Sequence, residues 1–458
     1  MPTRRQALFN NAMRNSEIVR RSYLWGWHID PIRQAAIAQQ ITEGIQKEDE
    51  RLRGLLTHPS IPKSFAKTFN PNSPPQLGKL FYDILEERVR FRTPTGNPGA
   101  GKDALQKMTE LSEDPAKSLA GCLRQRKILA KLKEAYIDNL QGITIVRPSA
   151  HVTAQVGGRW SYRDPALQTV PAKIKPMFIT RVDPKTGKRN WMVACDLAGA
   201  ELRTMAVQSG DQGMLDIFAA GGDLHALTAQ IAWGCTAEEA KTDPYRNPAK
   251  TLGLGAHYSV LDSEGAAAGL HAQLIAKVPG ITIEKVLGAV KRLEEGRPRV
   301  FEFKQETLDF AHANDYVEEP LNRRRRYFYG KVKDTESYNF AQQSMVSAIM
   351  DRGVQGIDAE LDHTREGLLL QRHDEVIHEG PDARRLVHLQ YEHLRQTHGV
   401  SGNSMNFEVD FWLGHRWGEG GTVIELKENR WLVEFPGREE SARFDDLDKA
   451  LDFAIPLV

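Results

Sequence analysis

Two short segments place carboxylates where they could serve a hard divalent cation. Residues 191–195 (WMVAC) are uncharged and predict a strand buried on both faces, and Asp196 follows directly. Residues 366–378 read as an apolar strand, a turn that contains Asp374 and Glu375, and a second apolar strand. If these strands lie side by side, Asp196 and Asp374 converge. An Asp at a strand end is more often a cap or turn residue, so the second carboxylate decides the interpretation.

Two converging carboxylates suit phosphoryl transfer. Asp196 and Asp374 could bridge two Mg²⁺ ions about 3.5–4 Å apart, which stabilise the attacking and leaving oxygens of an in-line displacement.

A basic pair lies between these segments in the sequence. A helix is expected from about Pro244, and its four-residue steps keep Arg246, Lys250, Leu254 and Tyr258 on one slowly rotating face. The Arg would fork onto terminal phosphate oxygens, while the Lys neutralises or protonates the leaving pyrophosphate. In isolation such a pair is more often ordinary surface charge, and only the surrounding motifs change this interpretation.

Several sequence elements, in the expected order, resemble those of the family A DNA polymerases, the bacterial DNA polymerase I type. The segment D-L-A-G-A-E-L-R from Asp196 resembles motif A, and R-H-D-E-V around Asp374 resembles motif C. The spacing R-x3-K-x7-Y from Arg246 is similar to motif B. Further similar segments are 69–77 (a thumb signature), 158–161 with 164–171, and 316–318 with 323–324. The resemblance covers about residues 69–417.

The resemblance implies a role for each matched residue. Asp196 and Asp374 would hold two Mg²⁺ ions, with Mn²⁺ as a substitute, and Glu375 and Lys250 would complete the catalytic group. The implied nucleotide-binding residues are Arg246, Lys250, Leu254, Tyr258, His225 and Glu201. The implied DNA-binding residues are Arg159, Gln168, Asn339, Gln343, His373, Arg323 and Arg324.

The implied fold is α+β, a right hand with a thumb, a palm built on an antiparallel sheet, and helical fingers. We expect a basic N-terminal segment at 1–30 and a small C-terminal β-hairpin extension at 417–458. Between them we expect the thumb at 31–135, the palm at 136–205 and 335–416, and the fingers at 206–334.

The implied function is DNA-templated DNA synthesis by two-metal-ion nucleotidyl transfer to a primer 3′-hydroxyl, in replication or repair. The partners would be primer-template DNA and deoxynucleoside triphosphates. Because the thumb begins within about 40 residues and a separate domain takes at least about 50, neither a 3′–5′ nor a 5′–3′ exonuclease is expected.

Two alternatives stay open. A single-subunit RNA polymerase shares the palm, but Glu201 lies where a ribose 2′-hydroxyl would have to fit. A catalytically inactive DNA-binding relative is disfavoured because both metal carboxylates, the Arg/Lys pair and Arg159 are present. The departures from the family pattern at Leu254, Ser259 and Gly199 concern sugar selectivity and fingers closure rather than the chemistry.

Composition adds limits rather than a function. The 458 residues carry 61 Lys plus Arg and 60 Asp plus Glu, so the net charge of +1 does not advertise a nucleic-acid partner. No apolar run is long enough for a membrane span, and no membrane partner is expected. Cys122, Cys195 and Cys235 fit reduced thiols in a cytoplasm, bacterial or of a phage-infected host, with a mitochondrial location disfavoured.

The two ends of the chain carry the remaining expectations. The Arg-rich opening predicts a solvated or DNA-contacting tail. Residues 421–426 and 431–435 predict a β-hairpin, followed by a short acidic helix at 445–453. This acid-rich extension is a poor DNA binder, and we expect a packing element or a docking site for a processivity or replisome partner. The spacing at Gly96–Lys102 meets part of a P-loop pattern, but Asp103 stands where a hydroxyl is needed.

Overall fold

The computed structural model describes residues 3–89, 92–93, 96–258, 264–275, 277–278, 280–427, 430–436 and 441–458. The chain forms two compact units. The sheet unit comprises residues 1–27, 147–170 and 179–458, and the helical unit comprises residues 28–146 and 171–178. Among the described residues, no helix has the length and apolar character needed to cross a membrane.

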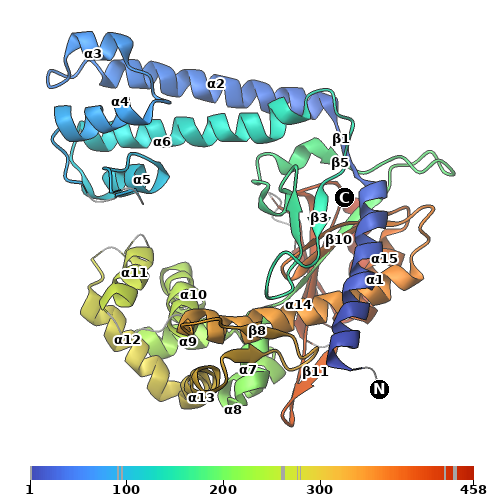
Figure 1. Ribbon diagram of the computed structural model, residues 1–458. Coiled ribbons are helices and arrows are strands. Elements are labelled where there is room, and N and C mark those ends of the chain that lie inside the picture. The colour runs from blue at the N-terminus through green and yellow to red at the C-terminus, as the bar shows by residue number, and fades with distance from the viewer. Residues whose placement is uncertain are drawn as a thin grey trace. The chain divides into compact units, whose positions relative to one another are not determined.

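The helical unit is built on two long helices, α2 (Pro31–Leu55) and α6 (Ala116–Leu132), which lie side by side (Figure 1). The Asp30 side chain caps α2 and accepts hydrogen bonds of 3.0 and 3.1 Å from the backbone N–H groups of Ile32 and Arg33. The short helices α3 (Lys63–Thr68), α4 (Pro74–Gly78) and α5 (Lys102–Leu111) complete the unit. Buried apolar side chains of α4, α5 and α6, including Leu77, Leu105 and Leu123, share one core.

The sheet unit contains an antiparallel sheet whose consecutive neighbours are β9, β10, β6, β13, β14, β15 and β16. The bounds are β6 (Trp191–Leu197), β9 (Gly367–Arg372), β10 (Glu375–Gly380), β13 (Val409–Arg416), β14 (Glu419–Lys427), β15 (Arg430–Glu434) and β16 (Ser441–Phe444). The strand predicted to end at Cys195 continues to Leu197, because β10 and β13 both pair with it there. Asp196 therefore lies inside the strand and not at its mouth.

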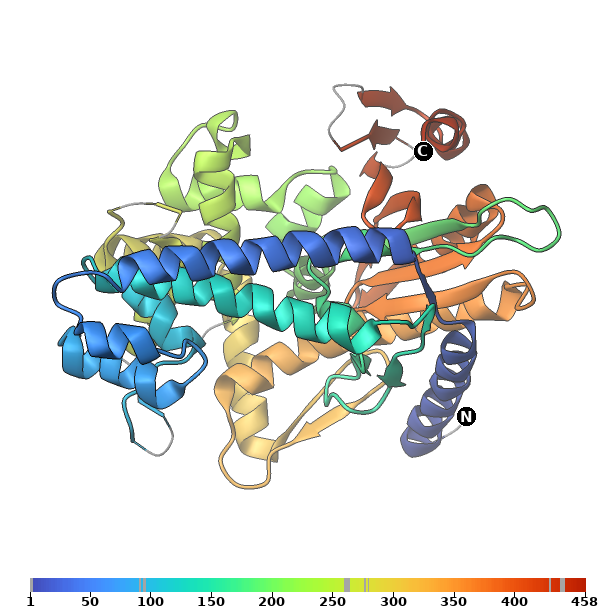
Figure 2. The same ribbon diagram turned by 90° about the horizontal axis from the view of Figure 1, so that it is seen from above.

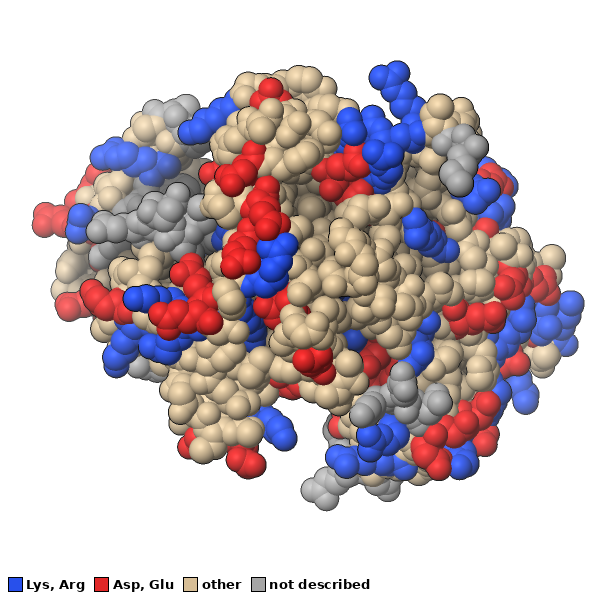
Figure 3. All heavy atoms as spheres, turned by 90° about the horizontal axis from the view of Figure 1, so that it is seen from below, with Lys and Arg blue, Asp and Glu red and all other residues tan. Residues whose placement is uncertain are grey.

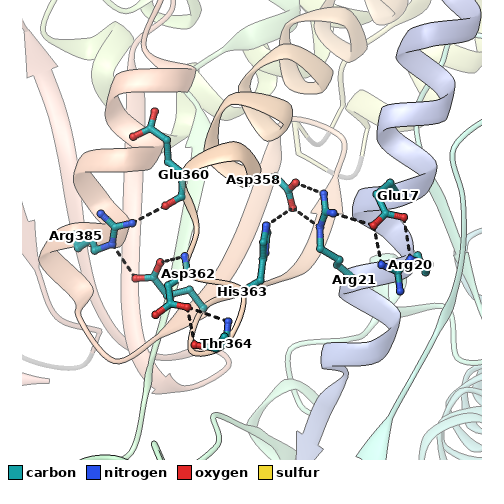
Figure 4. Close-up of polar contacts among 10 residues, drawn as sticks. Glu17, Arg20, Arg21, Asp358, Glu360, Asp362, His363, Thr364 and Arg385 are labelled. Atoms are coloured by element: carbon teal, nitrogen blue, oxygen red, sulfur yellow. Dashed lines mark hydrogen bonds and ion pairs between the residues drawn. The ribbon is translucent and has the colours of Figure 1, made fainter.

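The helix α1 (Arg4–Trp25) corrects the expectation of a solvated N-terminal tail. It packs against β9 and against α14 (Asp334–Glu360), and it buries Asn15, Ile18 and Ser22. Figure 4 shows the polar contacts at its C-terminal half: Arg21 lies between Glu17, at 2.9 Å, and Asp358 of α14. Arg21, which lies in the segment expected to be a solvated tail, therefore helps to hold α1 against α14.

The helices between the strands run in sequence from α7 to α13. Their bounds are α7 (Ala200–Ser209), α8 (Gln212–Ala219), α9 (Leu224–Trp233), α10 (Asp243–Tyr258), α11 (Glu264–Leu274), α12 (Ile283–Gly296) and α13 (Pro298–Asn314). The charged stretch 281–313 forms two helices, α12 and α13, because Pro298 lacks an N–H and disfavours helical geometry at the preceding residue. Figure 2 shows this group from a second direction.

Smaller elements complete the chain. β7 (Tyr316–Glu318) and β8 (Arg325–Tyr327) form an antiparallel ribbon whose connecting turn contains Arg323 and Arg324, and β11 (Thr397–Val400) pairs with β12 (Asn403–Asn406). β3 (Ser149–His151) pairs with β4 (Ser161–Arg163). The other short strands are β1 (Trp27–Ile29), β2 (Ile145–Val146) and β5 (Phe178–Ile179). α15 (Ala383–Leu394) packs against β6.

The expected C-terminal hairpin is present as β14 and β15, and it is part of the main sheet because β14 pairs with β13. A further strand, β16, pairs with β15, and α16 (Leu447–Ala454) follows, with its N-terminus capped by Asp446. The extension is therefore a continuation of the sheet edge. Glu425 of β14 is buried and forms an ion pair of 2.7 Å with Arg395, which ties the extension to the segment after α15.

Candidate active site

The strand register brings the two carboxylate segments together. Glu375 of β10 lies directly opposite Asp196 of β6, and the backbone N–H of Leu197 donates a hydrogen bond of 3.0 Å to the carbonyl of Asp374. The turn between β9 and β10 is His373–Asp374, with His373 in the left-handed region at φ 55°. The convergence of Asp196 and Asp374 that the apolar patterns predict thus follows from this pairing.

A fourth carboxylate, which the sequence interpretation missed, joins Asp196, Asp374 and Glu375. Asp410 of β13 lies directly opposite Asp196 on the other side of β6. Residues directly opposite in an antiparallel pair project to the same face, so Asp196, Glu375 and Asp410 form a row across three strands. The only sequence signal was an Asp in an otherwise apolar run, 409–413, which also fits a half-buried strand.

The acidic row is costly without a cation. Desolvation, followed by the charges of Asp374, Glu375 and Asp410, raises the pKa of Asp196 well above its usual range, although its side chain is exposed to solvent. Desolvation also raises the pKa of Asp374, and it raises that of Asp410 to about 6. Glu375 is partly neutralised by an ion pair of 2.8 Å with Arg372.

Whether these residues fit Mg²⁺ can be tested on the donor set. Hard oxygen ligands with unrelieved negative charge are what Mg²⁺ prefers, and it is usually held by one or two carboxylates together with waters and substrate phosphates. Asp196 and Asp374 meet that description. Within the described residues, no group of three or more His, Cys, Asp or Glu side chains is placed to hold a metal ion. An open site with two carboxylates is consistent with both observations.

A second cluster lies beside the acidic pair. Arg159 donates a hydrogen bond of 2.6 Å to Glu201 at the start of α7. Burial and then the Glu201 carboxylate raise the pKa of the Tyr258 hydroxyl at the end of α10. Glu201 also adds to the raised pKa of Asp374, so the charges of the two clusters interact. Arg159, Glu201 and Tyr258, which lie far apart in the sequence, form one group.

The segment that carries Arg159 is held by backbone contacts. The Gln168 side chain donates a hydrogen bond of 2.8 Å to the carbonyl of Trp160 and one of 3.4 Å to that of Gln371 in β9. Arg324 packs over Gly158, where an added Cβ would lie 2.9 Å from the guanidinium and where φ is 84°. Gln168 thus braces this segment, and its contact with DNA stays a prediction.

The basic pair of α10 meets the start of α9. Arg246 forms an ion pair of 2.5 Å with Asp223, whose carboxylate also caps α9 through the N–H groups of His225 and Ala226. Burial lowers the pKa of His225 to about 4, and the nearby Arg246 and Lys250 add to this, so its imidazole is neutral at pH 7. Lys250 is exposed. His225, Arg246 and Lys250 therefore present donors in one region.

The remaining predicted residues are less constrained. Asn339 and Gln343 lie half-buried on α14, and Leu254 is half-buried on α10. Burial lowers the pKa of His373, with Arg159 the next contribution. Arg323 is exposed and bonds to Glu318 at 2.9 Å. Ser259 lies outside the described residues.

Positive and negative charges are mixed on the face shown in Figure 3, where Lys and Arg side chains are interspersed with Asp and Glu. The mixture agrees with the net charge of +1. On this face, contacts to a polyanion would therefore depend on individual arginines and lysines and not on a continuous basic surface.

Comparisons with known proteins agree with this geometry. The family model described as DNA polymerase family A matches residues 41–419. The thermostable DNA polymerase I of Thermus thermophilus is 26% identical over 416 residues, covering 86% of this chain and 46% of that protein. DNA polymerase I of Geobacillus stearothermophilus is also 26% identical, over 420 residues, covering 86% of this chain and 44% of that protein. The chain spans about half the length of these curated relatives.

The solved structures provide the fold comparison. The POL domain of Pol1 from M. smegmatis, in a complex with DNA primer-template and dNTP, superposes with a TM-score of 0.74 at 21% identity. The match covers 89% of this chain and 70% of that one. The fold is therefore that of a right-hand polymerase. The chain belongs to DNA polymerase family A.

Proposed function

We propose that this chain is a DNA-templated DNA polymerase that adds deoxynucleotides to a primer 3′-hydroxyl in replication or repair. The observation that carries the proposal is the register of β6 and β10, which sets Asp374 beside Asp196 next to the Arg159–Glu201–Tyr258 cluster. The carboxylates of Asp196 and Asp374, which could hold metal ions beside this cluster, suit a reaction in which a hydroxyl attacks a triphosphate.

The metal ligands would be Asp196 and Asp374, with Mg²⁺ as the natural ion and Mn²⁺ as a substitute. Two bound ions would supply Lewis-acid stabilisation of the attacking and leaving oxygens and would relieve the repulsion within the acidic row. Glu375 supports this pair from β10 through its contact with Arg372. Desolvation raises the pKa values of Asp196 and Asp374, with neighbouring carboxylates adding to the effect, and those carboxylates would also attract a cation, which supports the assignment.

The triphosphate would be held by α9 and α10. Arg246, released from Asp223, can fork onto terminal phosphate oxygens, and exposed Lys250 can neutralise or protonate the leaving pyrophosphate. His225 lies in the first turn of α9, where backbone N–H groups and the helix dipole also favour an anion. Its imidazole is neutral and so would act as a hydrogen-bonding group rather than a cation.

The sugar and the duplex would be read by the second cluster and by α14. Glu201 and Tyr258 would close the space beside the 2′ position, with Leu254 one turn before Tyr258. Arg159 and Gln343 would inspect the minor groove, where correct pairs present similar acceptors. Asn339, His373, Gln168, Arg323 and Arg324 would contribute further contacts to the DNA.

The units suggest how the hand is divided. We assign the thumb to the helical unit, and the palm and fingers to the sheet unit. The family match ends at residue 419, so β15, β16 and α16 lie outside it. A processivity partner bound at this edge stays a prediction. We also infer that this chain contributes polymerisation without exonucleolytic excision.

The direct test is primer extension with purified protein on DNA and RNA templates, with deoxynucleotides and ribonucleotides in parallel. The proposal predicts Mg²⁺-dependent extension on the DNA template with deoxynucleotides. Extension only with ribonucleotides would indicate an RNA polymerase, and binding without any extension would indicate an inactive DNA-binding relative.

A further inference from the structure

The ribbon of β7 and β8 has one face in the core and one face in solvent. Val317 and Phe328 are buried in a cluster with Ala311, Val332 and Phe340. Tyr316 lies directly opposite Tyr327 across the ribbon, so both project to the other face. In an antiparallel ribbon with one buried face, the solvent face is usually polar. Here it carries aromatic rings.

These rings form a connected series that we call the aromatic ladder, defined as Phe310, Tyr316, Tyr327 and Tyr329. Phe310 of α13 meets Tyr316 edge-on with centroids 5.4 Å apart, and Tyr316 and Tyr327 are 5.6 Å apart. Tyr327 and Tyr329 are stacked at 6.4 Å with an interplanar angle of 26°. Tyr329 is 96% exposed, Phe310 44% and Tyr327 40%. The outermost ring contributes almost nothing to packing.

Guanidinium groups flank the ladder. Arg325 lies over the Tyr316 ring, 4.2 Å from its centroid, and is held there by an ion pair of 2.5 Å with Glu318. Hydrogen bonding to Arg325, and also to Arg4 of α1, keeps the pKa of the Tyr327 phenol below its usual value. Rings interleaved with arginines are the pattern that binds single-stranded nucleic acid, because every base has a π-face and the arginines serve the phosphates.

The ribbon also adjoins the candidate active site. The turn between β7 and β8 carries Arg324, which packs over Gly158. Arg159, the residue after Gly158, donates a hydrogen bond to Glu201. Phe310 also borders a cavity of about 300 Å³ whose lining includes Phe303, Pro320 and the carboxylate residues Glu306 and Glu318. A strand that leaves the site along the ribbon would meet the exposed rings beside this cavity.

We propose that the aromatic ladder binds single-stranded DNA by base stacking, and that its occupant is the unpaired template next to the active site. This inference rests on the proposed polymerase function. Tyr329 and Tyr327 supply the stacking surface, while Arg325 and Arg4 lie beside it for the backbone phosphates. Arg4 and Arg325 beside the rings favour a polyanion over an uncharged or basic peptide, and Arg325 would exchange its Glu318 partner for a phosphate.

The test measures how much a 5′ template overhang strengthens binding. Equilibrium affinity is measured for primer-template duplexes that are blunt or carry overhangs of increasing length, with 2-aminopurine in the overhang to report stacking. The variants are Tyr329→Ala, Tyr327→Ala and Tyr329→Phe, with Tyr23→Ala as the matched control, since Tyr23 is an exposed tyrosine on α1. Primer extension by the wild-type protein is measured in the same preparations.

We expect an overhang to tighten binding by the wild-type protein and to quench 2-aminopurine. Loss of one stacking ring should weaken overhang binding about 10-fold, because stacking on aromatic side chains is a main source of affinity for single strands. Tyr329→Phe and Tyr23→Ala should behave as wild type, and blunt-duplex affinity should not change. An overhang effect in Tyr329→Ala and Tyr327→Ala as large as that in the wild-type protein would overturn the inference. Loss of the overhang effect in Tyr329→Phe would also overturn it.

The two proposals fail in different ways. A wild-type protein that extends primers but gains no affinity from an overhang overturns the ladder inference alone. A wild-type protein that never extends a primer overturns the polymerase proposal.

Discussion

The side chains of Asp196 and Asp410 project to the same face of the sheet because the two residues are direct cross-strand neighbours in β6 and β13. Like charges placed directly opposite each other in a sheet are destabilising. The arrangement therefore costs folding free energy in the metal-free protein. Cations bound to the neighbouring carboxylates would offset this repulsion and would explain why two aspartates lie opposite each other.

Asp410→Asn should stabilise the metal-free protein. The folded-state pKa of Asp410 is raised to about 6, so between about pH 4 and pH 6 the folded state binds more protons than the unfolded state, and stability falls as pH rises through that window. The gain from Asn should be about 1 kcal/mol above pH 6, after allowing for solvent screening, and should vanish below about pH 4.

Thermal unfolding in EDTA across this pH range measures the effect. Primer extension should be retained, and added Mg²⁺ should reduce the gain. An unchanged melting temperature at pH 7 would contradict the proposed repulsion.

Much of the fold follows from local sequence rules. The apolar runs of β6 and β9 and the basic pair on α10 lie where the sequence predicts them. These features depend on neighbouring residues, which are visible in the sequence itself. The helix break at Pro298 follows from the same kind of local rule.

The missed features depend on contacts between distant segments. The docking of α1 depends on Asp358, more than 300 residues away, so its arginines read as a solvated tail. Asp410 reads as one polar position in an apolar strand, and only the pairing of β13 with β6 shows that it faces Asp196. The ion pair of Arg159 with Glu201 also joins separate segments. Register and long-range ion pairs are tertiary information, which motifs alone do not contain.

Glu201→Ala should weaken discrimination against ribonucleotides. Removing the side chain opens space beside the 2′ position and releases Arg159, and we expect the preference for deoxynucleotides to fall by about 10- to 200-fold. Relative kcat/KM for the two sugars measures it. Glu201→Gln, which keeps the volume and an acceptor for Arg159, should retain most of the preference. Equal sugar preference in Glu201→Ala and wild type would remove this role.

Arg246→Ala should raise the KM for deoxynucleotides about 10-fold, because charge-assisted hydrogen bonds to the triphosphate are lost. Steady-state kinetics on one primer-template separates this from an effect on DNA affinity. The control is Arg299→Ala, an Arg of α13 whose ion pair of 2.7 Å with Glu306 is at the surface. A KM equal to that of the control would show that Arg246 serves only to pair with Asp223.

The purified protein should not shorten a mismatched primer. In the proposed site, Asp196 and Asp374 would join a triphosphate to a 3′-hydroxyl, whereas hydrolysis of the terminal phosphodiester needs a water on the opposite side of the phosphorus. An end-labelled primer with a 3′ mismatch, incubated with Mg²⁺ and no nucleotides, tests this. Shortening that disappears in Asp374→Ala would show that the chain does excise.

The most direct measurement is single-turnover primer extension by Asp374→Asn with Mg²⁺, alongside its affinity for the same primer-template. A carboxylate that holds the metal contributes several kcal/mol in the transition state, so the rate should fall at least about 10³-fold. DNA affinity should stay within about twofold, because distributed phosphate contacts provide it. Asp445→Asn, at an exposed position beyond the family match, should extend normally. Extension by Asp374→Asn at the wild-type rate would contradict the proposed site.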